Sequence, residues 1–477
     1  MSEFLLPARM REATQGRWLA AGLPDCAPTG VCTDTRDAMQ GTVFLALRGE
    51  RFDAHDFLND AEQAGAAMLI VEREPARAPR IPVLVVQSTR TALGDLARAW
   101  RAKLTSTRVI AVTGSAGKTT TCRLIDGVLA TERSGSASRK SFNNDIGVPL
   151  TILAARRGHQ YLVLEIGMNH PGEIAALAAM AQPDIAVITM IGRVHLEGLG
   201  SEEAIAVEKS SLLDGLAPAG VAIINGDSAM LAAAMRQRPM HGRKLVRFGR
   251  DAARPLEVRL TGRNTHPSGQ TITVNGDWSA ELRLPGEHNA VNALAAIAVG
   301  RAFGVSDVGI RMGLASVAPA AMRMERVERD GIVFFNDAYN ANPDAMAASI
   351  RTFAEITPDA PRRVIVLGDM LELGDAAAAL HREVGAEAAA VDRVRRLHAA
   401  ILVGTFAPHT HEGLRSAGWS GDALVVPALN SWTLPQVLGS FRAGDAVLLK
   451  GSRGSAMERV LTAAAAVSSH SQPTPSG

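Results

Sequence analysis

The sequence predicts an α/β protein of three domains: a central P-loop-type parallel sheet, an N-terminal α/β domain and a C-terminal Rossmann-like α/β domain. Three observations lead to this prediction. A chain of 477 residues is long enough for about three domains of roughly 150 residues each. Strand-like and helix-like segments alternate along most of it, which is typical of parallel sheets. A glycine-rich turn, "GSAGKTT", joins an apolar strand to the helix that follows it.

The alternation of strands and helices restarts along the chain, and this suggests the domain boundaries. Residues 1–105 contain the short apolar runs "TVFLAL" and "AAMLIVE", with the helical pattern "DFLNDAEQAGA" between them. Residues 106–317 open with the strand "RVIAVTG" and continue with "YLVLEIG", "DIAVITMIG" and "GVAIING" between alanine-rich helices. We therefore predict an N-terminal domain over the first range and a central domain over the second.

The same pattern returns in residues 318–465, where "GIVFFND", "RRVIVLGD", "AAILVG" and "DAVLLKGS" are predicted strands. This range is the predicted C-terminal domain. Before it, residues 245–284 are rich in strand-forming patterns, and "AVNALAAIAVGRAFG" predicts a helix that ends at its final glycine. Residues 466–477 form a Ser- and Pro-rich tail that we expect to be disordered.

Composition narrows the class of protein. The chain has 50 basic and 48 acidic residues, a formal charge of +2, and no basic block, which argues against nucleic acid as a partner. Its three cysteines are an odd number in a long chain, so no disulfide framework is implied. The sequence shows neither a signal-peptide pattern nor an apolar run of about 18 residues. We expect a cytoplasmic protein with no membrane span.

Lysine is rare, with six lysines against 44 arginines. A lysine retained in such a chain favours a position that needs a compact, titratable amine. Chance retention of a few surface lysines explains the same count equally well for any one of them.

The stretch "AVTGSAGKTTT" has the features of a phosphate-binding loop. A strand leads into the glycines and a helix should begin at the lysine, so backbone N–H groups and the helix N-terminus would hold phosphates. Lys118 would reach the terminal phosphates and Thr119 would bind Mg²⁺. An ordinary glycine turn is the alternative. The predicted nucleotide-binding residues of this loop are Thr113, Gly114, Ser115, Ala116, Gly117, Lys118, Thr119 and Thr120.

Two polar residues follow neighbouring predicted strands of the central domain. Glu165 ends "YLVLE", and His195 comes shortly after "DIAVITMIG". Parallel sheets bind ligands at the carboxyl ends of their strands, and a carboxylate with an imidazole at that edge suits a second metal ion. A helix cap for Glu165 and a structural role for His195 are the alternatives.

These motifs together resemble the Mur ligases, which build the peptide stem of peptidoglycan, and the resemblance covers nearly the whole chain. It includes "TDTRDAMQGTVFLALRGERFDAHDF", "TGSAGKTTT", "FNNDIGVP", "EIGMNHPGEI", "HLEGLGS", "LPGEHNAVNALAA", "NDAYNANPDAM", "VLGDMLELG" and "LLKGSRGSAMERV". The pair "YNANPDAM" and "GDMLELG" resembles the members that join D-alanyl-D-alanine to UDP-N-acetylmuramoyl-tripeptide. The resemblance implies that the three domains bind the UDP-sugar, bind ATP and complete the ligase site, in chain order.

In such ligases ATP phosphorylates the tripeptide carboxylate, and the amine of D-alanyl-D-alanine then displaces phosphate from the acyl phosphate. The resemblance implies ATP and two Mg²⁺ ions as cofactors, with Thr119, Glu165 and His195 among the metal ligands. It also implies a carbamoylated lysine as a ligand, at Lys209. The implied catalytic residues are Lys118, Glu165, His195, Lys209 and Arg323.

Further contacts follow from the same resemblance. Asn289 and Asn292 match residues near the adenine, although one of them would serve equally well as a helix N-cap. Arg323 matches a residue that reaches the γ-phosphate when the domains close. The nucleotide-facing loop matches Asp337, Tyr339, Asn340 and Asn342. The implied substrate contacts are Thr35 and Arg36 for the uridine nucleotide, Asn143 and Asn144 in "FNNDIGVP", and Lys450, Ser452 and Arg453 for the dipeptide.

Because these residues lie on different domains, we expect the catalytic set to assemble only when the central and C-terminal domains close. We expect a monomer that acts on small molecules. Three other interpretations compete: a sibling ligase that adds a single amino acid, a nucleotide-binding switch that makes no bond, and a nucleic-acid motor. The third stem residue, meso-diaminopimelate or lysine, is left open by the sequence.

Overall fold

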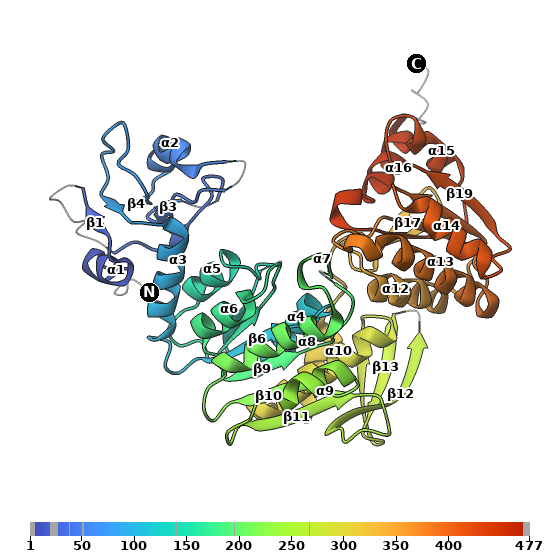
Figure 1. Cartoon of the computed structure of the whole chain (residues 1–477), viewed down its shortest axis with the longest axis horizontal. Coiled ribbons are helices and arrows are strands. Elements are labelled where there is room, and N and C mark those ends of the chain that lie inside the picture. The colour runs from blue at the N-terminus through green and yellow to red at the C-terminus, as the bar shows by residue number, and fades with distance from the viewer. Residues whose placement is uncertain are drawn as a thin grey trace, which may run out of the picture.

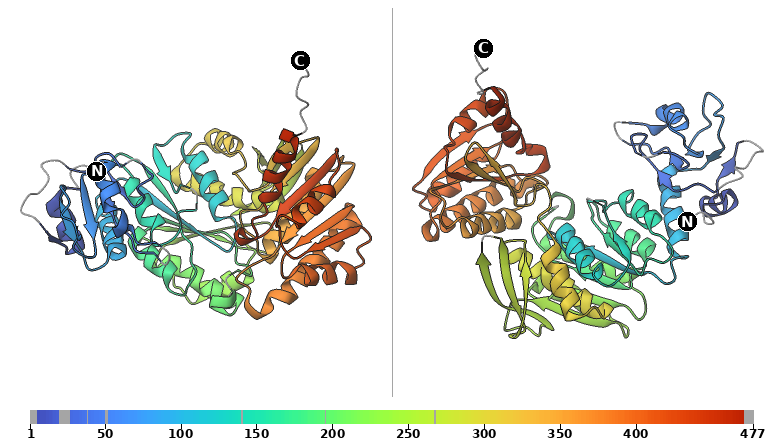
Figure 2. Two further views of the ribbon diagram at one scale, coloured as in Figure 1. Left: turned by 90° about the horizontal axis from the view of Figure 1, so that it is seen from above. Right: turned by 180° about the vertical axis from the view of Figure 1, so that it is seen from behind.

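The computed structural model of the chain forms three lobes, each built on its own sheet (Figure 1). It describes residues 5–19, 27–37, 39–49, 52–139, 141–194, 196–266 and 268–470. The N-terminal and C-terminal lobes rise on opposite sides of the central lobe, and the view from behind shows the same separation (Figure 2). The predicted α/β fold of three domains is therefore confirmed.

The first lobe holds a five-stranded sheet in the order β1-β5-β4-β3-β2, with only β1 antiparallel to its neighbour. Its strands are β1 (Arg17–Trp18), β2 (Val31–Cys32), β3 (Val43–Leu45), β4 (Met68–Val71) and β5 (Val83–Val85). Its helices are α1 (Pro7–Thr14), α2 (Leu58–Gln63) and α3 (Thr89–Arg101), with a 3₁₀ turn at Ala54–Phe57. The strands are short because loops interrupt each apolar run.

Helix α3 joins the first lobe to the central one. The Trp100 side chain is fully buried, and its indole N–H donates to Ala155 O at 3.0 Å. Arg101 Nε donates to Ala181 O at 2.8 Å. One continuous cluster of buried apolar side chains contains residues of both lobes, from Leu5 to Leu231. The first lobe is thus held to the central lobe by a shared apolar core.

The central lobe contains nine strands in the order β14-β13-β12-β11-β10-β9-β6-β8-β7, parallel from β12 to β7 and antiparallel from β12 to β14. The strands are β6 (Arg108–Thr113), β7 (Gly135–Ala137), β8 (Tyr161–Glu165), β9 (Ile185–Ile188), β10 (Val221–Asn225), β11 (Lys244–Gly249), β12 (Val258–His266), β13 (Gly269–Val274) and β14 (Trp278–Leu282). The helices are α4 (Lys118–Leu129), α5 (Gly147–Ala154), α6 (Glu173–Ala181), α7 (Leu196–Leu199), α8 (Glu202–Ser210), α9 (Ala229–Arg236), α10 (Glu287–Phe303) and α11 (Asp307–Ser316), with a 3₁₀ turn at Ser211–Gly215.

Strand β6 shows why the middle of this sheet is stable. Val109 and Ala111 pack into the apolar cluster on one face, while Ile110 and Val112 pack into the cluster on the other. This alternation follows from the two-residue repeat of a strand. A strand buried on both faces reads as a continuous apolar run, and full burial of one such valine or isoleucine contributes about 1.5–3 kcal/mol.

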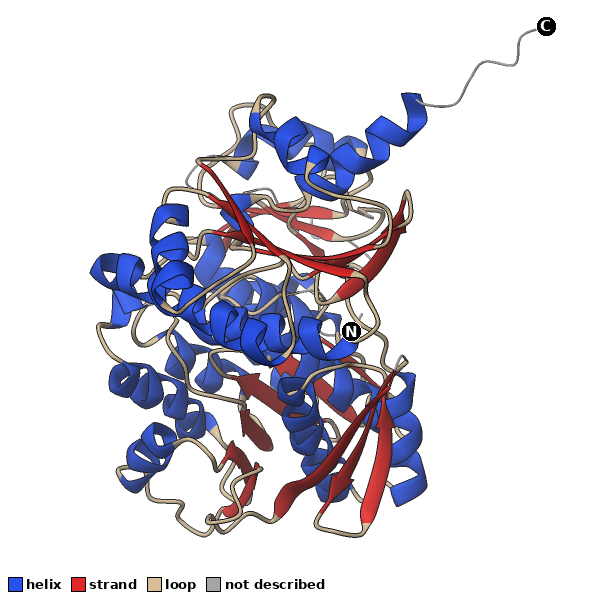
Figure 3. Ribbon diagram, turned by 90° about the vertical axis from the view of Figure 1, so that its right-hand side faces the viewer, coloured by secondary structure: helices blue, strands red, loops and turns tan. Residues whose placement is uncertain are grey.

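The third lobe has a six-stranded sheet in the order β15-β16-β20-β17-β18-β19, with helices on both faces (Figure 3). Its strands are β15 (Glu325–Arg329), β16 (Ile332–Asn336), β17 (Arg362–Gly368), β18 (Ala399–Val403), β19 (Asp422–Val426) and β20 (Asp445–Lys450). Its helices are α12 (Pro343–Ile356), α13 (Ala377–Val394), α14 (Ala407–Ser416), α15 (Thr433–Gly439) and α16 (Arg459–His470), with 3₁₀ turns η3 (Gly374–Ala376) and η4 (Arg453–Ser455). Only β15 is antiparallel to its neighbour.

The predicted disordered tail, residues 466–477, stays a prediction. In the structure helix α16 continues to His470, beyond the predicted end of the C-terminal domain at residue 465. The four alanines at 463–466 explain the extension, because alanine has the highest helix propensity. Residues 471–477 lie outside the described part of the chain. None of the described helices has the length and apolar character needed to cross a membrane.

Candidate active site

The predicted phosphate-binding loop lies between β6 and α4. Helix α4 begins at Lys118, as the sequence predicts, and its N-cap Gly117 is left-handed with φ +81°. A Cβ at Gly117 would collide with the amide of Asn292, so a side chain is excluded both by the backbone angle and by the close approach of α10. The loop therefore presents its backbone N–H groups and a helix N-terminus to the space above the sheet.

Lys118 folds back over this loop. Its Nζ donates to Gly114 O at 2.8 Å. Burial lowers the pKa of the Lys118 amine, the nearby Arg323 lowers it further, and the Glu165 carboxylate opposes both effects. A cation held inside a glycine loop at a helix N-terminus is suited to bind an anion such as a phosphate.

Glu165 lies at the end of β8 and is almost completely buried. Thr119 Oγ1 donates to its Oε2 at 2.8 Å, and Asn143 Nδ2 donates to its Oε1 at 2.8 Å. The alternative role of Glu165 as a helix cap finds no such contact among the described residues. Carboxylate and hydroxyl oxygens side by side are donors of the kind that Mg²⁺ prefers.

His195 lies outside the described residues, so its predicted place beside Glu165 remains a prediction. Within the described ranges, no three His, Cys, Asp or Glu side chains group together as a metal site would require. The part of the predicted metal site that the structure brings together is therefore Thr119 with Glu165.

Lys209, near the end of helix α8, lines the same cavity as Glu165. Its side chain is 1% exposed. Burial holds the pKa of the Lys209 amine well below its usual range, the neighbouring Lys118 lowers it further, and Glu208 opposes these effects. A buried amine with a depressed pKa gives up its proton more readily than an exposed lysine, which is the property expected of a functional lysine.

A cavity of about 970 Å³ separates the central lobe from the third lobe and collects most of the predicted residues. Those that line it are Ser115, Ala116, Gly117, Lys118, Thr119, Thr120, Asn143, Asn144, Glu165, Lys209, Asn289, Asn292, Arg323, Asp337, Tyr339, Asn340, Asn342 and Lys450. Thr113 and Gly114 lie just below it, at the end of β6 and the start of the loop. Two lobes thus supply the walls of one cavity.

The third lobe already contacts the phosphate-binding loop. Arg323 Nη2 donates to Thr119 Oγ1 at 3.1 Å, and its guanidinium lies 4.2 Å from the centre of the Tyr339 ring. The Tyr339 hydroxyl donates to Ser141 Oγ at 2.5 Å. Arg323 and Tyr339 thus contact the central lobe in this structure, and assembly of the catalytic set on domain closure stays a prediction.

The three residues predicted to hold the dipeptide differ in burial and in whether they face the cavity. Lys450 is buried, and its Nζ pairs with Asp337 Oδ2 at 2.7 Å and donates to Asn340 O at 3.1 Å. Ser452 is also buried: its hydroxyl accepts from the N–H of residue 371 and donates to the carbonyl of residue 341. Arg453 is exposed and pairs with Glu458 at 2.9 Å. Of the three, only Lys450 faces the cavity.

The two asparagines of α10 are not helix caps. The N-cap of this helix is Gly286, and Asn289 Nδ2 donates to Pro285 O at 2.7 Å. Asn292 packs against Gly117. Asn342, in contrast, is the N-cap of α12 and accepts from the N–H of residue 345 at 2.9 Å.

Thr35 and Arg36 lie apart from this cavity, in the loop after β2 of the first lobe. Arg36 is exposed and pairs with Asp34 at 2.5 Å. The side-chain hydrogen bond from Arg36 lowers the pKa of Asp34 to about 2.

Sequence reasoning missed several groups at the cavity. His288 lies on α10 next to the predicted Asn289, and burial lowers its pKa to about 4. Arg263 of β12 pairs with Glu355 of α12 at 2.7 Å, which joins the central and third lobes. The motif "LPGEHNAVNALAA" contains His288, so the sequence could have indicated this residue. No local pattern marks the pair of Arg263 and Glu355, because the two residues come from different lobes.

Comparison with known proteins identifies this architecture. Family models match three parts of the chain: "Mur ligase family, catalytic domain" at residues 28–101, "Mur ligase middle domain" at 112–300, and "Mur ligase, glutamate ligase domain" at 322–453. The UDP-N-acetylmuramoyl-tripeptide–D-alanyl-D-alanine ligase of Bacillus subtilis is 37% identical, over 91% of this chain and 92% of the relative. The chain belongs to the Mur ligase family.

Other Mur ligases match the chain over most of its length. The ligase of the same name from Escherichia coli is 36% identical, over 92% of this chain and 94% of its own. A crystal structure of MurF from Acinetobacter baumannii matches with a TM-score of 0.84 at 32% identity, over 95% of this chain and 97% of that one. MurF ligase from Thermotoga maritima in complex with ADP matches with a TM-score of 0.73 at 28% identity, over 91% and 96%. The predicted membership is confirmed, and the ADP complex supports ATP use.

Proposed function

We propose that this chain is the ATP-dependent ligase that joins D-alanyl-D-alanine to UDP-N-acetylmuramoyl-tripeptide and releases ADP and phosphate. The observation that carries the proposal is the cavity whose walls come from the phosphate-binding loop on one side and from the "YNANPDAM" segment on the other. Relatives that match over nine-tenths of the chain bear the name of this ligase.

The reaction has two steps. An oxygen of the tripeptide carboxylate bonds to the γ-phosphorus of ATP, and the bond between that phosphorus and the ADP oxygen breaks. The amine of the dipeptide then bonds to the acyl carbon, phosphate leaves, and the amine loses its proton to solvent or to the leaving phosphate. The first step brings one anion to another, so cations fixed in advance lower its barrier. Lys118, which folds over the phosphate-binding loop, and Arg323, which contacts Thr119, would fill this role.

The residues fit Mg²⁺. We propose Thr119 as a ligand of one ion, and Glu165, His195 and Lys209 as ligands of a second; Thr119 and Glu165 lie within hydrogen-bond distance of each other. When bound, Mg²⁺ would neutralise charge on the phosphates. We further propose that Lys209 is carbamoylated: its neutral amine adds CO₂ and loses a proton, which converts a buried amine into an oxygen ligand. Burial and the lowered pKa of Lys209 favour this reaction.

The remaining assignments complete the proposal. We assign residues 1–105 to the UDP-sugar, with Thr35 and Arg36 as contacts, 106–317 to ATP and 318–465 to the dipeptide step. Asn289 and Asn292 would lie beside the adenine. For the dipeptide carboxylate we propose Lys450, Ser452 and Arg453, of which Lys450 lines the cavity. We also propose that the enzyme is a cytoplasmic monomer, and its third stem residue is left to the assay.

Phosphate release from ATP tests the function. Purified protein is given UDP-N-acetylmuramoyl-tripeptide, carrying either meso-diaminopimelate or lysine, with D-alanyl-D-alanine, with single amino acids, or with no acceptor. We expect release that depends on the dipeptide, and a product heavier than the tripeptide by the dipeptide less water. Release that depends on one amino acid would identify a sibling ligase. Release that ignores every acceptor would favour a nucleotide switch.

A further inference from the structure

The segment 189–193 follows β9 and is bound to the phosphate-binding loop. Ser115 N donates to Met190 O at 2.8 Å. The Ser115 hydroxyl donates to Gly192 O at 3.0 Å and accepts from Gly192 N at 2.9 Å. The positions of Gly192 and of Arg193, the next residue, are therefore set by the loop that is expected to hold the phosphates.

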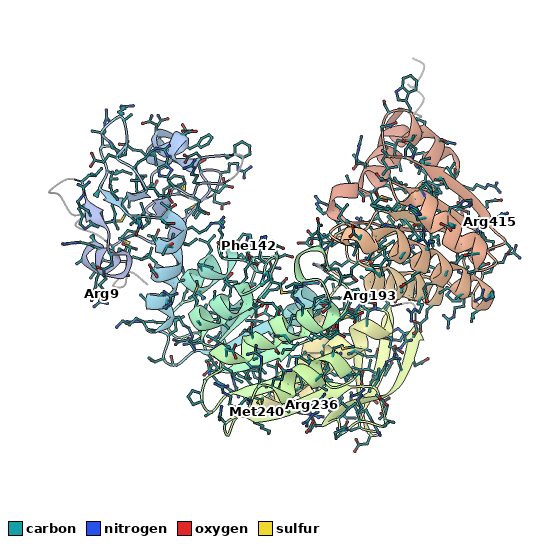
Figure 4. All side chains as sticks on the ribbon, viewed as in Figure 1. Arg9, Phe142, Arg193, Arg236, Met240 and Arg415 are labelled. Carbon is teal, nitrogen blue, oxygen red and sulfur yellow. The ribbon has the colours of Figure 1, made fainter. Side chains whose placement is uncertain are left out.

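Arg193 crosses from the central lobe to the third lobe. Its backbone N–H donates to Asp344 Oδ2 at 3.0 Å, and its Nη2 lies 3.4 Å from Asp344 Oδ1. Its Nη1 forms a short ion pair with Glu383. Figure 4 labels Arg193 where the two lobes meet. Asp344 belongs to α12 and Glu383 to α13, so a single guanidinium bridges two helices of the third lobe.

Gly192, Leu196 and Glu197 add contacts between the central and third lobes besides the ion pairs. A Cβ on Gly192 would collide with the Asp344 carboxylate, so the Gly192 backbone lies directly against that side chain. Leu196 packs against the apolar cores of both lobes. Glu197 N donates to Glu372 O at 3.4 Å. The connection is thus continuous from Ser115 of the phosphate-binding loop to the third lobe.

Helix α12 carries this connection to the cavity. Asp344 is its second residue, and the segment directly before it, 339–342, lines the cavity. The helix N-terminus also favours the Asp344 carboxylate. Arg193 and Glu383 themselves do not line the cavity. Arg193 therefore acts on the site through the placement of α12, without a place in the cavity wall.

We propose that Arg193 is a positioning residue for the ligase reaction: its ion pairs with Asp344 and Glu383 couple the phosphate-binding loop to the third lobe and hold Tyr339 and Arg323 against it. This inference rests on the proposed function.

Charge reversal at Glu383 tests the coupling, because this partner lies outside the cavity. Arg193→Glu and Glu383→Arg are each expected to lower kcat/KM for D-alanyl-D-alanine about tenfold, a typical coupling between sites. The double variant restores the pair between positions 193 and 383 but leaves a glutamate beside Asp344. It should therefore recover part of the loss, at least about threefold over either single variant, since residues in contact are not additive. If the fold-loss in kcat/KM of the double variant equals the product of the two single losses, the proposal is overturned.

A matched pair on the same helix serves as control. Arg382 and Glu412 join α13 to α14 on the exposed surface, and reversing either should leave kcat/KM within about twofold, because exposed ion pairs contribute little. Small-angle X-ray scattering separates this inference from the proposed function. The radius of gyration should rise in each single variant, because the two lobes separate, and should return toward the wild-type value in the double variant. This change does not depend on whether any product forms. An unchanged radius in all three would count against the coupling.

Discussion

Thr119, in the first turn of α4, and Glu165, at the end of β8, share a hydrogen bond of 2.8 Å from Thr119 Oγ1 to Glu165 Oε2. The second carboxylate oxygen accepts from Asn143, and Arg323 donates to the same Thr119 hydroxyl from the other lobe. A buried carboxylate is therefore held in one orientation by neutral donors. This arrangement leaves its charge available to a metal ion.

Glu165→Gln should remove that charge while the side chain keeps its size. We expect kcat to fall by about 10²–10³, the range for losing one electrostatic group in a reaction centre, and the Mg²⁺ concentration for half-maximal rate to rise. Initial ligase rates over a Mg²⁺ titration measure both. Glu281→Gln, at an exposed glutamate paired with His266, is the control. Equal Mg²⁺ dependence in wild type and Glu165→Gln would contradict the metal assignment.

Lys209→Met should abolish ligase activity and raise the melting temperature by a few degrees. The buried amine of Lys209 costs free energy that a methionine of similar length avoids. Differential scanning fluorimetry in CO₂-depleted buffer, alongside phosphate release, measures both properties. Lys103 is exposed, and Lys103→Met should change neither property. A lower melting temperature for Lys209→Met would show that the amine stabilises the fold.

The strands around the site were predictable because burial on both faces leaves continuous apolar runs, as in β6 and β8. The phosphate-binding loop was predictable because its glycines are required by backbone angle and contact. The short strands β7, β15 and β19 were missed, because partly exposed edge strands lack such runs. The sequence also suggested Ser452 as a dipeptide contact, since a hydroxyl after a strand looks available. Its use by backbone groups depends on the folded loop.

The ion pairs between lobes could not be predicted from the sequence. Arg193 meets Glu383, and Arg263 meets Glu355, only because the lobes take one relative orientation. No periodicity within either lobe encodes that orientation.

The pH dependence of stability should reveal His288. Burial is the main cause that lowers its pKa to about 4; Lys450 and Arg263 act in the same direction, while Asp337 and Glu355 oppose them. The folded state thus binds this proton more weakly than the unfolded chain does. The stabilisation is complete above about pH 6.5 and is lost as the pH falls toward about 4, by up to about 3 kcal/mol at 1.36 kcal/mol per pKa unit.

His288→Asn should therefore flatten the fall in melting temperature between pH 6.5 and pH 4.5, because the variant has no imidazole to protonate. His241 is exposed and left-handed, with φ +43°, so His241→Asn is a control that asparagine accommodates. Parallel melting curves for wild type and His288→Asn across this range would show that the acid sensitivity arises elsewhere.

The crowding at Gly117 can be separated from its backbone angle. Gly117→Ala forces a left-handed alanine and a collision with Asn292, whereas Gly158→Ala, at φ +94°, meets nothing within 4 Å. We expect Gly158→Ala to cost only the backbone strain, about 1–2 kcal/mol, with ATP affinity unchanged. Gly117→Ala should cost more and weaken ATP binding at least about tenfold, because the buried Asn292 side chain or the loop must move. Calorimetric ATP titration and thermal melts measure the two effects. Adding Asn292→Ala to Gly117→Ala should bring the stability loss down to that of Gly158→Ala, and a double variant as unstable as Gly117→Ala alone would mean that strain, not crowding, requires glycine at this position.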